Sequence, residues 1–236
     1  MKTIFYPENE RGQANHGWLQ AKHSFSFGHF YNPNLVHFGV LRVLNDDIIE
    51  ASMGFGTHPH DNMEIITIPL EGALAHKDSM GHSSVIKAGE IQVMSAGTGI
   101  QHSEYNALDD QSINLLQIWL FPNKRNVTPR YQQQELDTAD MHNNWSQVLS
   151  PSADDKGVWI HQDAWFHLGE FDANTETSYT LKNPSNGLYV FVIEGGVTIG
   201  ELELGKRDAV GITHSETVPF RFSGKSKVLL MEIPMS

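Results

Sequence analysis

The sequence predicts an all-β protein that is built from two similar halves. Three observations support this fold class. Short runs of β-forming residues alternate with glycine and proline, helical periodicity is nearly absent, and one pattern of strand and turn occurs twice. With 236 residues, the chain is long enough for one large domain or two small ones, each with a sizeable core.

In the first half, the expected strands are bounded by turn residues. Residues 64–71 form a β-rich run that Gly72 ends, and residues 84–87 lead into a turn at Gly89. Residues 91–94 follow and run into a glycine-rich turn, and the long apolar run 113–121 ends at Pro122. Short strands with this punctuation are typical of a β-sandwich or a β-barrel.

The second half has the same character. Strands are expected at 188–193, 197–199, 201–204 and 227–233, and the first of them ends at a glycine pair, Gly195 and Gly196. Only residues 132–145 have a composition that allows a short helix. The second half is therefore also expected to be β structure.

An internal repeat links the two halves. An apolar residue, a glutamate and a glycine end one strand at Gly72 and another at Gly195. Each glycine is followed by an expected hairpin and then by a second glycine, Gly89 or Gly205. A repeat of about half the chain indicates a duplicated domain. The proline-containing segment 121–130 and the polar stretch after it form the expected connection, so we predict domains at 1–125 and 126–236.

Composition excludes several classes of protein. The 28 acidic residues exceed the 16 basic ones and give a net charge of -12, which argues against a nucleic-acid partner because binding to phosphates needs a basic face. The chain has no cysteine, which excludes disulfides, thiolate zinc sites and a cysteine nucleophile. No apolar run is long enough for a signal peptide or a membrane span, so a cytoplasmic location is expected.

Histidine is unusually frequent, with 13 residues, and two of them form the pair His58 and His60. Residues two apart on a strand point to the same face, so both imidazoles project together, whereas on a helix they would diverge. The spacing therefore fits metal binding on a β scaffold. By itself the pair is weak evidence, because a chain this rich in histidine can contain it by chance.

A second pair, His102 and Glu104, strengthens the interpretation. It has the same spacing and also follows a glycine-rich turn. Two strands that each present two ligands can hold one cation, and three imidazoles with one carboxylate suit first-row transition metals rather than calcium or magnesium. Four protein ligands leave up to two open positions on an octahedral ion, as catalysis requires. The alternative is two unrelated pairs on the surface.

These residues resemble known motifs. The segments around His58 to Gly72 and around Gly89 to His102 are similar to the two cupin motifs. A narrower likeness is carried by the strings His58-Pro59-His60, Leu70-Glu71-Gly72, 94–105, Asn15-His-Gly-Trp18, 23–27, 41–46 and His161-Gln-Asp163. In these strings the chain resembles the pirins, and within them the bacterial branch with quercetin 2,3-dioxygenase activity.

The resemblance implies a bicupin, with two double-stranded β-helix barrels. It places one metal ion in the N-terminal barrel, bound by His58, His60, His102 and Glu104. It also implies that Glu64, a ligand in the general cupin pattern, lies outside the ligand set and holds a neighbouring group.

The C-terminal barrel is expected to be degenerate and metal-free. Counting from its glycine turns gives Leu181, Asn183 and Val218 at the ligand positions, and none of them coordinates a metal well. The triplet that begins at His214 and ends at Glu216 copies 102–104 but lacks a His-x-His partner.

For function, the resemblance implies a dioxygenase that uses O2 to open the heterocycle of a flavonol such as quercetin, with release of carbon monoxide. Glu104 is the candidate catalytic base, and the planar, apolar substrate predicts a pocket lined with residues such as Met53, Phe55 or Ile118. Iron is the first expectation for the metal; the ligand set also accepts nickel, manganese, cobalt, copper or zinc. Two alternatives remain open: a metal-dependent regulatory module that binds a protein partner without turnover, and an enzyme for another phenol or enediol.

The remaining histidines have plainer interpretations. Those near the N-terminus are expected to pack or to form hydrogen bonds; they are His16, His23, His29 and His37. A second group is expected at the surface or in turns; it consists of His76, His82, His142 and His167.

Overall fold

The computed structural model describes residues 1–236 and confirms the all-β prediction. The chain forms strands β1 to β22, and its helical structure is one 3₁₀ turn, η1 (Glu8–Glu10). The expected short helix within 132–145 is wrong. Its first residues belong to β12 (Arg130–Glu135), which pairs antiparallel with β9 (Glu90–Ser95), so the sheet satisfies the backbone groups that a helix would have paired internally. No helix has the length and hydrophobicity needed to cross a bilayer.

The chain divides into two compact units. We call residues Gly12–Leu136 with Val158–Gln162 the N-terminal barrel, and Met1–Arg11, Asp137–Gly157 and Asp163–Ser236 the C-terminal barrel. The first strand, β1 (Lys2–Tyr6), belongs to the C-terminal barrel because it pairs along its whole length with β20 (Ala209–Thr213). The boundary predicted at residue 125 divides the chain by sequence position, and sequence position alone cannot assign an N-terminal strand to the later barrel.

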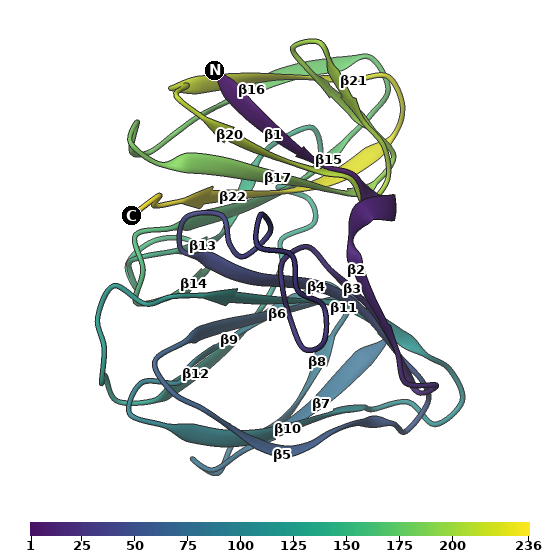
Figure 1. Cartoon of the computed structure of the whole chain (residues 1–236), viewed down its shortest axis with the longest axis vertical. Helices are drawn as coiled ribbons and strands as arrows, with labels where there is room; N and C mark the ends of the chain where they lie inside the picture. The colour runs from purple at the N-terminus through teal and green to yellow at the C-terminus, as the bar shows by residue number, and fades with distance from the viewer. The chain divides into compact units, whose positions relative to one another are not determined.

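Two sheets form the N-terminal barrel (Figure 1). One runs in the order β12-β9-β6-β11-β4-β3-β2, and the other in the order β5-β10-β7-β8. In addition to β9 and β12, the strands of this barrel are β2 (Gly12–Asn15), β3 (Leu19–His23), β4 (Leu41–Ile49), β5 (Gly54–His60), β6 (Glu64–Glu71), β7 (Ala73–Asp78), β8 (Ser83–Lys87), β10 (Ile100–Asn106), β11 (Ile113–Leu120) and β14 (Val158–Trp159).

The C-terminal barrel has the same plan. One sheet contains β1-β20-β17-β22-β15-β13 in this order, and the other runs β16-β21-β18-β19. In addition to β1 and β20, its strands are β13 (Ser146–Ser150), β15 (Trp165–Phe171), β16 (Thr175–Thr180), β17 (Gly187–Glu194), β18 (Val197–Ile199), β19 (Leu202–Leu204), β21 (Thr217–Phe222) and β22 (Ser226–Ile233).

The internal repeat is also visible in backbone detail. Gly72 and Gly195 both have φ of 77°, a left-handed value that glycine adopts without strain. Just before each glycine the ladder is interrupted: β6 shifts register against β11, and β17 shifts against β22. The matching strand order and matching register shift confirm the two-barrel fold.

The two interiors are filled differently. A single apolar cluster, running from Phe171 to Leu230, fills the C-terminal barrel. In the N-terminal barrel, apolar clusters lie beside buried polar side chains from three strands of the large sheet, among them Asn45, Asp47, Thr67 and Gln117. Buried polar groups are costly unless they find partners, so this group of polar side chains indicates a functional site in the N-terminal barrel.

Candidate metal centre

The two predicted ligand pairs lie on adjacent strands. Strands β5 and β10 run side by side (Figure 1). His58 and His60 are at the end of β5, and His102 lies directly opposite His58 on the antiparallel strand β10. The rings are in contact, with centroid separations of 4.4 Å between His58 and His102 and 4.9 Å from His60 to each of the others. The predicted strand geometry, in which residues i and i+2 share a face, is therefore present for His58 and His60 on β5.

A close approach of the two strands helps to set this register. A Cβ atom on Gly54 would lie 2.2 Å from the carbonyl oxygen of Glu104, so only glycine fits there. The register then shifts between His102 and Glu104, so that Glu104 lies opposite Phe55. A β-bulge of this kind changes the direction of side chains locally. Here the bulge lies between His102 and Glu104.

Potential ligand atoms of His58, His60 and His102 all lie within 4.8 Å of one another. Nδ1 of His58 donates to the carbonyl oxygen of Gly56 at 2.8 Å, which leaves its Nε2 as an acceptor. Nε2 of His60 and Nε2 of His102 are buried and have no hydrogen-bond partner. Unpaired buried nitrogens are unfavourable, and a cation among the three rings would pair them.

Burial keeps two of these imidazoles neutral. Desolvation, followed by the neighbouring His58, lowers the pKa of His60 to about 4. Desolvation, followed by the surrounding histidines, lowers the pKa of His102 to about 2. Because only a neutral imidazole can bind a metal, both side chains are ready to coordinate at neutral pH.

Glu104 is buried at the side of this cluster. Nε2 of Gln117 donates to its two carboxyl oxygens at 3.2 and 3.1 Å. Burial raises the pKa of Glu104 to about 7, against the opposing effect of hydrogen bonds from Gln117 and Thr67. The close group of ligand atoms contains the three histidines without Glu104. Its place in the ligand set therefore stays a prediction.

Glu64 has a different environment. It is 1 % exposed and accepts a hydrogen bond of 2.7 Å from the hydroxyl of Ser95. Burial raises its pKa to about 7, while Ser95, the backbone of His161 and the charge of Arg130 act in the opposite direction. These contacts agree with the interpretation of Glu64 as a residue that holds its neighbours.

A cavity of about 420 Å³ opens beside the cluster. Its wall includes His58, His60 and Glu104, and most of the remaining surface is apolar. The other side chains and glycines that line it are Trp18, Leu19, Ala21, His23, Phe27, Asn45, Asp47, Gly54, Phe55, Gly56, Gln117 and Trp119. Edge-to-face contacts lock several rings in place, such as His60 with Trp119 and Trp18 with Phe55, so the wall is preformed. An apolar cleft with a few convergent polar groups is the usual form of a small-molecule site.

Two histidines contradict their expected surface positions. His76 is 2 % exposed and contacts His102, and His167 is 5 % exposed inside the C-terminal barrel. His167 lies within a run of buried residues of β15, and His76 lies on β7, where most residues are buried. An isolated histidine gives no signal in the sequence of whether its side chain faces inward. His82 and His142 are exposed, as expected.

The four N-terminal histidines have different surroundings. His23 is buried, bonds Asn45 at 2.8 Å and lines the cavity, while His37 is exposed and bonds the backbone of Gly39. His16 and His29 line a neighbouring groove that shares Trp18 and Phe27 with the cavity. These contacts fit the expected roles in packing and hydrogen bonding.

Asp47 was not identified from the sequence. It lines the cavity, is 4 % exposed, and its Oδ1 has no hydrogen-bond partner. Burial, followed by the nearby Asp46 and Glu104, raises its pKa well above the usual range. The alternation of residues along 41–49 could have indicated that Asp47 faces inward, because Val43, Asn45 and Ile49 share its face.

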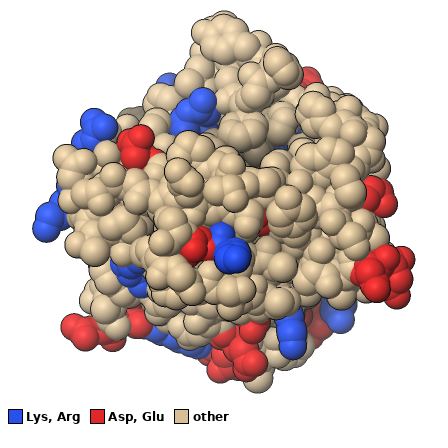
Figure 2. Space-filling view, turned by 90° about the horizontal axis from the view of Figure 1, so that it is seen from below, with Lys and Arg blue, Asp and Glu red and all other residues tan.

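The C-terminal barrel contains no comparable cluster. His214 and Glu216 are exposed, and His214 has the left-handed φ of 58° that belongs to a turn. Leu181 and Val218, which occupy counted ligand positions, are buried in the apolar cluster of this barrel. On the face shown in Figure 2, Lys and Arg are scattered among Asp and Glu without forming a continuous basic patch.

Family models match both halves of the chain. A model described as Pirin matches residues 5–120, and one described as the quercetinase C-terminal cupin domain matches residues 147–233. The chain is 42% identical over 226 residues to the quercetin 2,3-dioxygenase of Escherichia coli strain K12, covering 96% of each chain. It is 35% identical over 227 residues to a pirin-like protein of Caulobacter vibrioides, covering 96% of this chain and 97% of the relative.

Among solved structures, the chain is similar to bacterial pirin YhhW from Escherichia coli in complex with nickel(II). The TM-score is 0.94 with 39% sequence identity, and the match covers 100% of both chains. A second crystal structure of YhhW gives a TM-score of 0.95 with 40% identity, covering 100% of this chain and 99% of the other.

Proposed function

The chain belongs to the pirin family, and from this premise we propose that it is a metal-dependent dioxygenase that opens the heterocycle of a flavonol such as quercetin and releases carbon monoxide. The metal would be held by His58, His60, His102 and Glu104 in the N-terminal barrel. Iron is our first expectation for the ion, and the nickel in the similar structure makes nickel the first alternative. A metal-free C-terminal barrel and a cytoplasmic location are part of the same proposal.

The observation that carries this proposal is the arrangement of the three histidines. Their ligand atoms converge within 4.8 Å, and two of the Nε2 atoms are buried without a partner. A protein that needed these rings only for packing would gain by pairing or replacing them. The ligand types, imidazole with a nearby carboxylate, suit a first-row transition metal.

The cavity supports a planar aromatic substrate. Its walls bring Trp18, Phe27, Phe55 and Trp119 beside the histidines, and rings of this kind stack on or contact the edges of an aromatic ligand. Polar side chains such as Asn45 and Asp47 line the same cavity and can hydrogen-bond phenolic groups. Of the lining residues proposed from sequence, Phe55 lines the cavity, whereas Met53 is 42% exposed and Ile118 is fully buried.

The chemistry requires loss of a proton from the flavonol 3-hydroxyl. A bound transition metal lowers the pKa of a coordinated hydroxyl. Glu104 is the candidate base, because its buried carboxyl group lies in the wall of the cavity beside the histidines. Gln117, which donates to both carboxyl oxygens, orients Glu104 in this role.

The test is anaerobic reconstitution of the metal-free protein with Fe(II), Ni(II), Mn(II), Co(II) or Cu(II). An aerobic assay with quercetin then follows flavonol loss and carbon monoxide. We expect stoichiometric binding and turnover with at least one ion, and loss of both in His60→Ala. Stoichiometric binding with no turnover by any ion would refute the quercetin assignment and favour the alternative of a regulatory module or of another phenolic substrate.

The double role of Glu104 has its own test. In Glu104→Gln the amide oxygen can still coordinate, but the amide cannot accept the substrate proton. We expect turnover to fall by about 100-fold or more, the usual contribution of a general base, while metal content falls less. Equal losses of turnover and metal content would show that Glu104 acts as a ligand only.

A further inference from the structure

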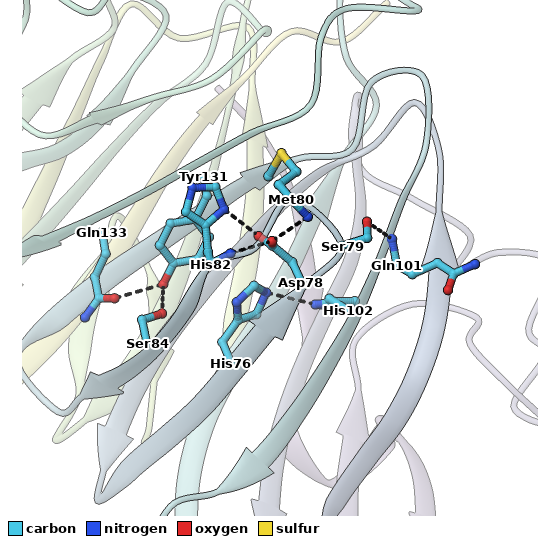
Figure 3. A network of polar contacts seen from close by, with 10 residues as sticks. All are labelled: His76, Asp78, Ser79, Met80, His82, Ser84, Gln101, His102, Tyr131 and Gln133. Carbon is cyan, nitrogen blue, oxygen red and sulfur yellow. Dashed lines mark hydrogen bonds and ion pairs between the residues drawn. The ribbon is translucent and has the colours of Figure 1, made fainter.

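His76 holds an unusual position behind the histidine cluster. It lies on β7, next to β10, and it pairs with Glu104 in the antiparallel register. Both His76 and His102 are 2% exposed, and Nδ1 of His102 lies 3.2 Å from Nε2 of His76. Figure 3 shows the two rings facing each other across the two strands. The contact therefore joins a predicted metal ligand to a second buried imidazole.

The protonation of this pair follows from the geometry. A ligand nitrogen must be unprotonated, so if Nε2 of His102 faces the metal, its single proton lies on Nδ1. That proton is donated to Nε2 of His76, which must then carry its own proton on Nδ1. Nδ1 of His76 is buried and has no hydrogen-bond partner. An unpaired buried donor destabilises a fold, so packing alone does not explain a histidine here.

The surroundings hold the ring of His76 in place. Its ring lies against Tyr131 at a centroid distance of 5.0 Å, and His82 stacks against Tyr131 at 5.1 Å. The hydroxyl of Tyr131 bonds Ser84 and donates to Gln133, and Asp78 bonds Nδ1 of His82 at 2.9 Å (Figure 3). His76 thus has little freedom to rotate away from His102.

We propose that His76 is a positioning residue: Nε2 of His76 accepts the Nδ1 proton of His102 and so fixes the tautomer and the ring plane that aim Nε2 of His102 at the metal. The inference rests on the proposed metal centre. Groups that bond the outer nitrogen of a ligating histidine commonly orient it, and their loss weakens metal affinity or activity by about 10–100-fold. Here a second imidazole takes a position that a carboxylate or a backbone carbonyl usually occupies.

The first experiment needs no metal. Imidazole nitrogen chemical shifts of the metal-free protein, from long-range ¹H–¹⁵N correlation spectra, report which nitrogen carries the proton. We expect His102 and His76 each to carry it on Nδ1. In His76→Phe, which fills the space without an acceptor, the spectrum of His102 should show a mixture of tautomers. A wild-type spectrum with the proton on Nε2 of His102 would overturn the proposal, whether or not any variant folds.

The second experiment measures Ni(II) affinity by competition with a chelator. We expect the dissociation constant to rise by about 10–100-fold in His76→Phe and by much less in His76→Gln, whose amide oxygen keeps an acceptor. His167→Phe is the matched control, since it removes a buried histidine from the other barrel and should leave the affinity unchanged. Equal affinities in wild type and His76→Phe would refute the proposal, whereas a wild type that binds no metal would refute the proposed function instead.

Discussion

The N-terminal and C-terminal barrels share one architecture but place different side chains at equivalent positions of their strands. Ala75 and Thr198 are equivalent, because each lies three residues after its glycine turn. Ala75 pairs with Tyr105, and Thr198 pairs with Arg221. This register places Val218 and Phe220 where the N-terminal barrel has His102 and Glu104. In the same way, Tyr179 lies opposite Val218 as His58 lies opposite His102.

The large sheets of the two barrels also carry different side chains at equivalent positions. Gln117 of β11 pairs with Thr67, and the equivalent rung of the C-terminal barrel pairs Leu230 with Val190. On the next strand, Asn45 corresponds to His167. The comparison teaches that the ladder fixes which positions face inward, while the side chains decide whether the interior becomes a site or a core.

The largest expected effect comes from giving the N-terminal barrel a residue of its counterpart. His102→Val copies Val218 and removes one imidazole from the cluster, so we expect metal affinity and quercetin turnover to fall by more than the roughly 100-fold typical of indirect ligand support. Metal content after dialysis and the quercetin assay measure this. His214→Ala, an exposed histidine of the other barrel, should change neither. Retention of one metal per chain in His102→Val would contradict the proposed ligand set.

The next largest effect is a loss of stability that we expect only in the C-terminal barrel. The buried carboxyl group of Glu232 accepts hydrogen bonds from the hydroxyl of Tyr179, the backbone of Lys182 and Asn183, and the amide of Asn186. In Glu232→Gln an amide group would face donors, so we expect a loss of about 3–5 kcal/mol in unfolding free energy.

Hydrogen–deuterium exchange would locate this loss. Faster exchange is expected in β16 and β22, with metal content per folded chain unchanged. Glu176→Gln, an exposed change in the same barrel, is the control. If Glu232→Gln also lost metal per folded chain, the histidine cluster would not be independent of the C-terminal core.

A smaller effect depends on pH. Burial, with a contribution from Lys182, lowers the pKa of His167 to about 3. Because the unfolded chain binds the proton more strongly, the stability is fully present above the unfolded value near 6.5 and is lost as pH falls toward 3. His167→Asn, which copies Asn45, removes this titration. From pH 7 to pH 4, metal-free wild type should lose about 3 kcal/mol more than the variant in urea unfolding. Parallel losses would show that His167 does not titrate in this way.

The smallest effect compares the two equivalent glycine turns. Alanine at either position must adopt a left-handed φ of 77°, at a penalty of about 1–2 kcal/mol. The added Cβ would lie 2.3 Å from the backbone oxygen of Lys225 in Gly195→Ala, but 2.4 Å from a side-chain methyl of Ile113 in Gly72→Ala. Since a side chain moves more easily than a backbone, thermal unfolding should show Gly195→Ala to be the less stable variant. The reverse order would mean that the two turns relax differently.

The sequence by itself determined the all-β class, the strand positions and the duplication. Strand and turn preferences are local, and the i, i+2 spacing of His58 with His60 and of His102 with Glu104 follows from the two-residue period of a strand. The family could be recognised for the same reason, because its motifs are short and contiguous. These features need no knowledge of which strands become neighbours.

Only the tertiary structure decided what surrounds the histidines. Pairing of β5 with β10 brings His58 opposite His102, and pairing of β10 with β7 brings His76 behind it, across 26 residues of sequence. The same holds for Asp47 in the cavity wall and for β1 in the C-terminal barrel. Such contacts depend on strand order and register, which are set by burial over the whole barrel, so no local pattern records them.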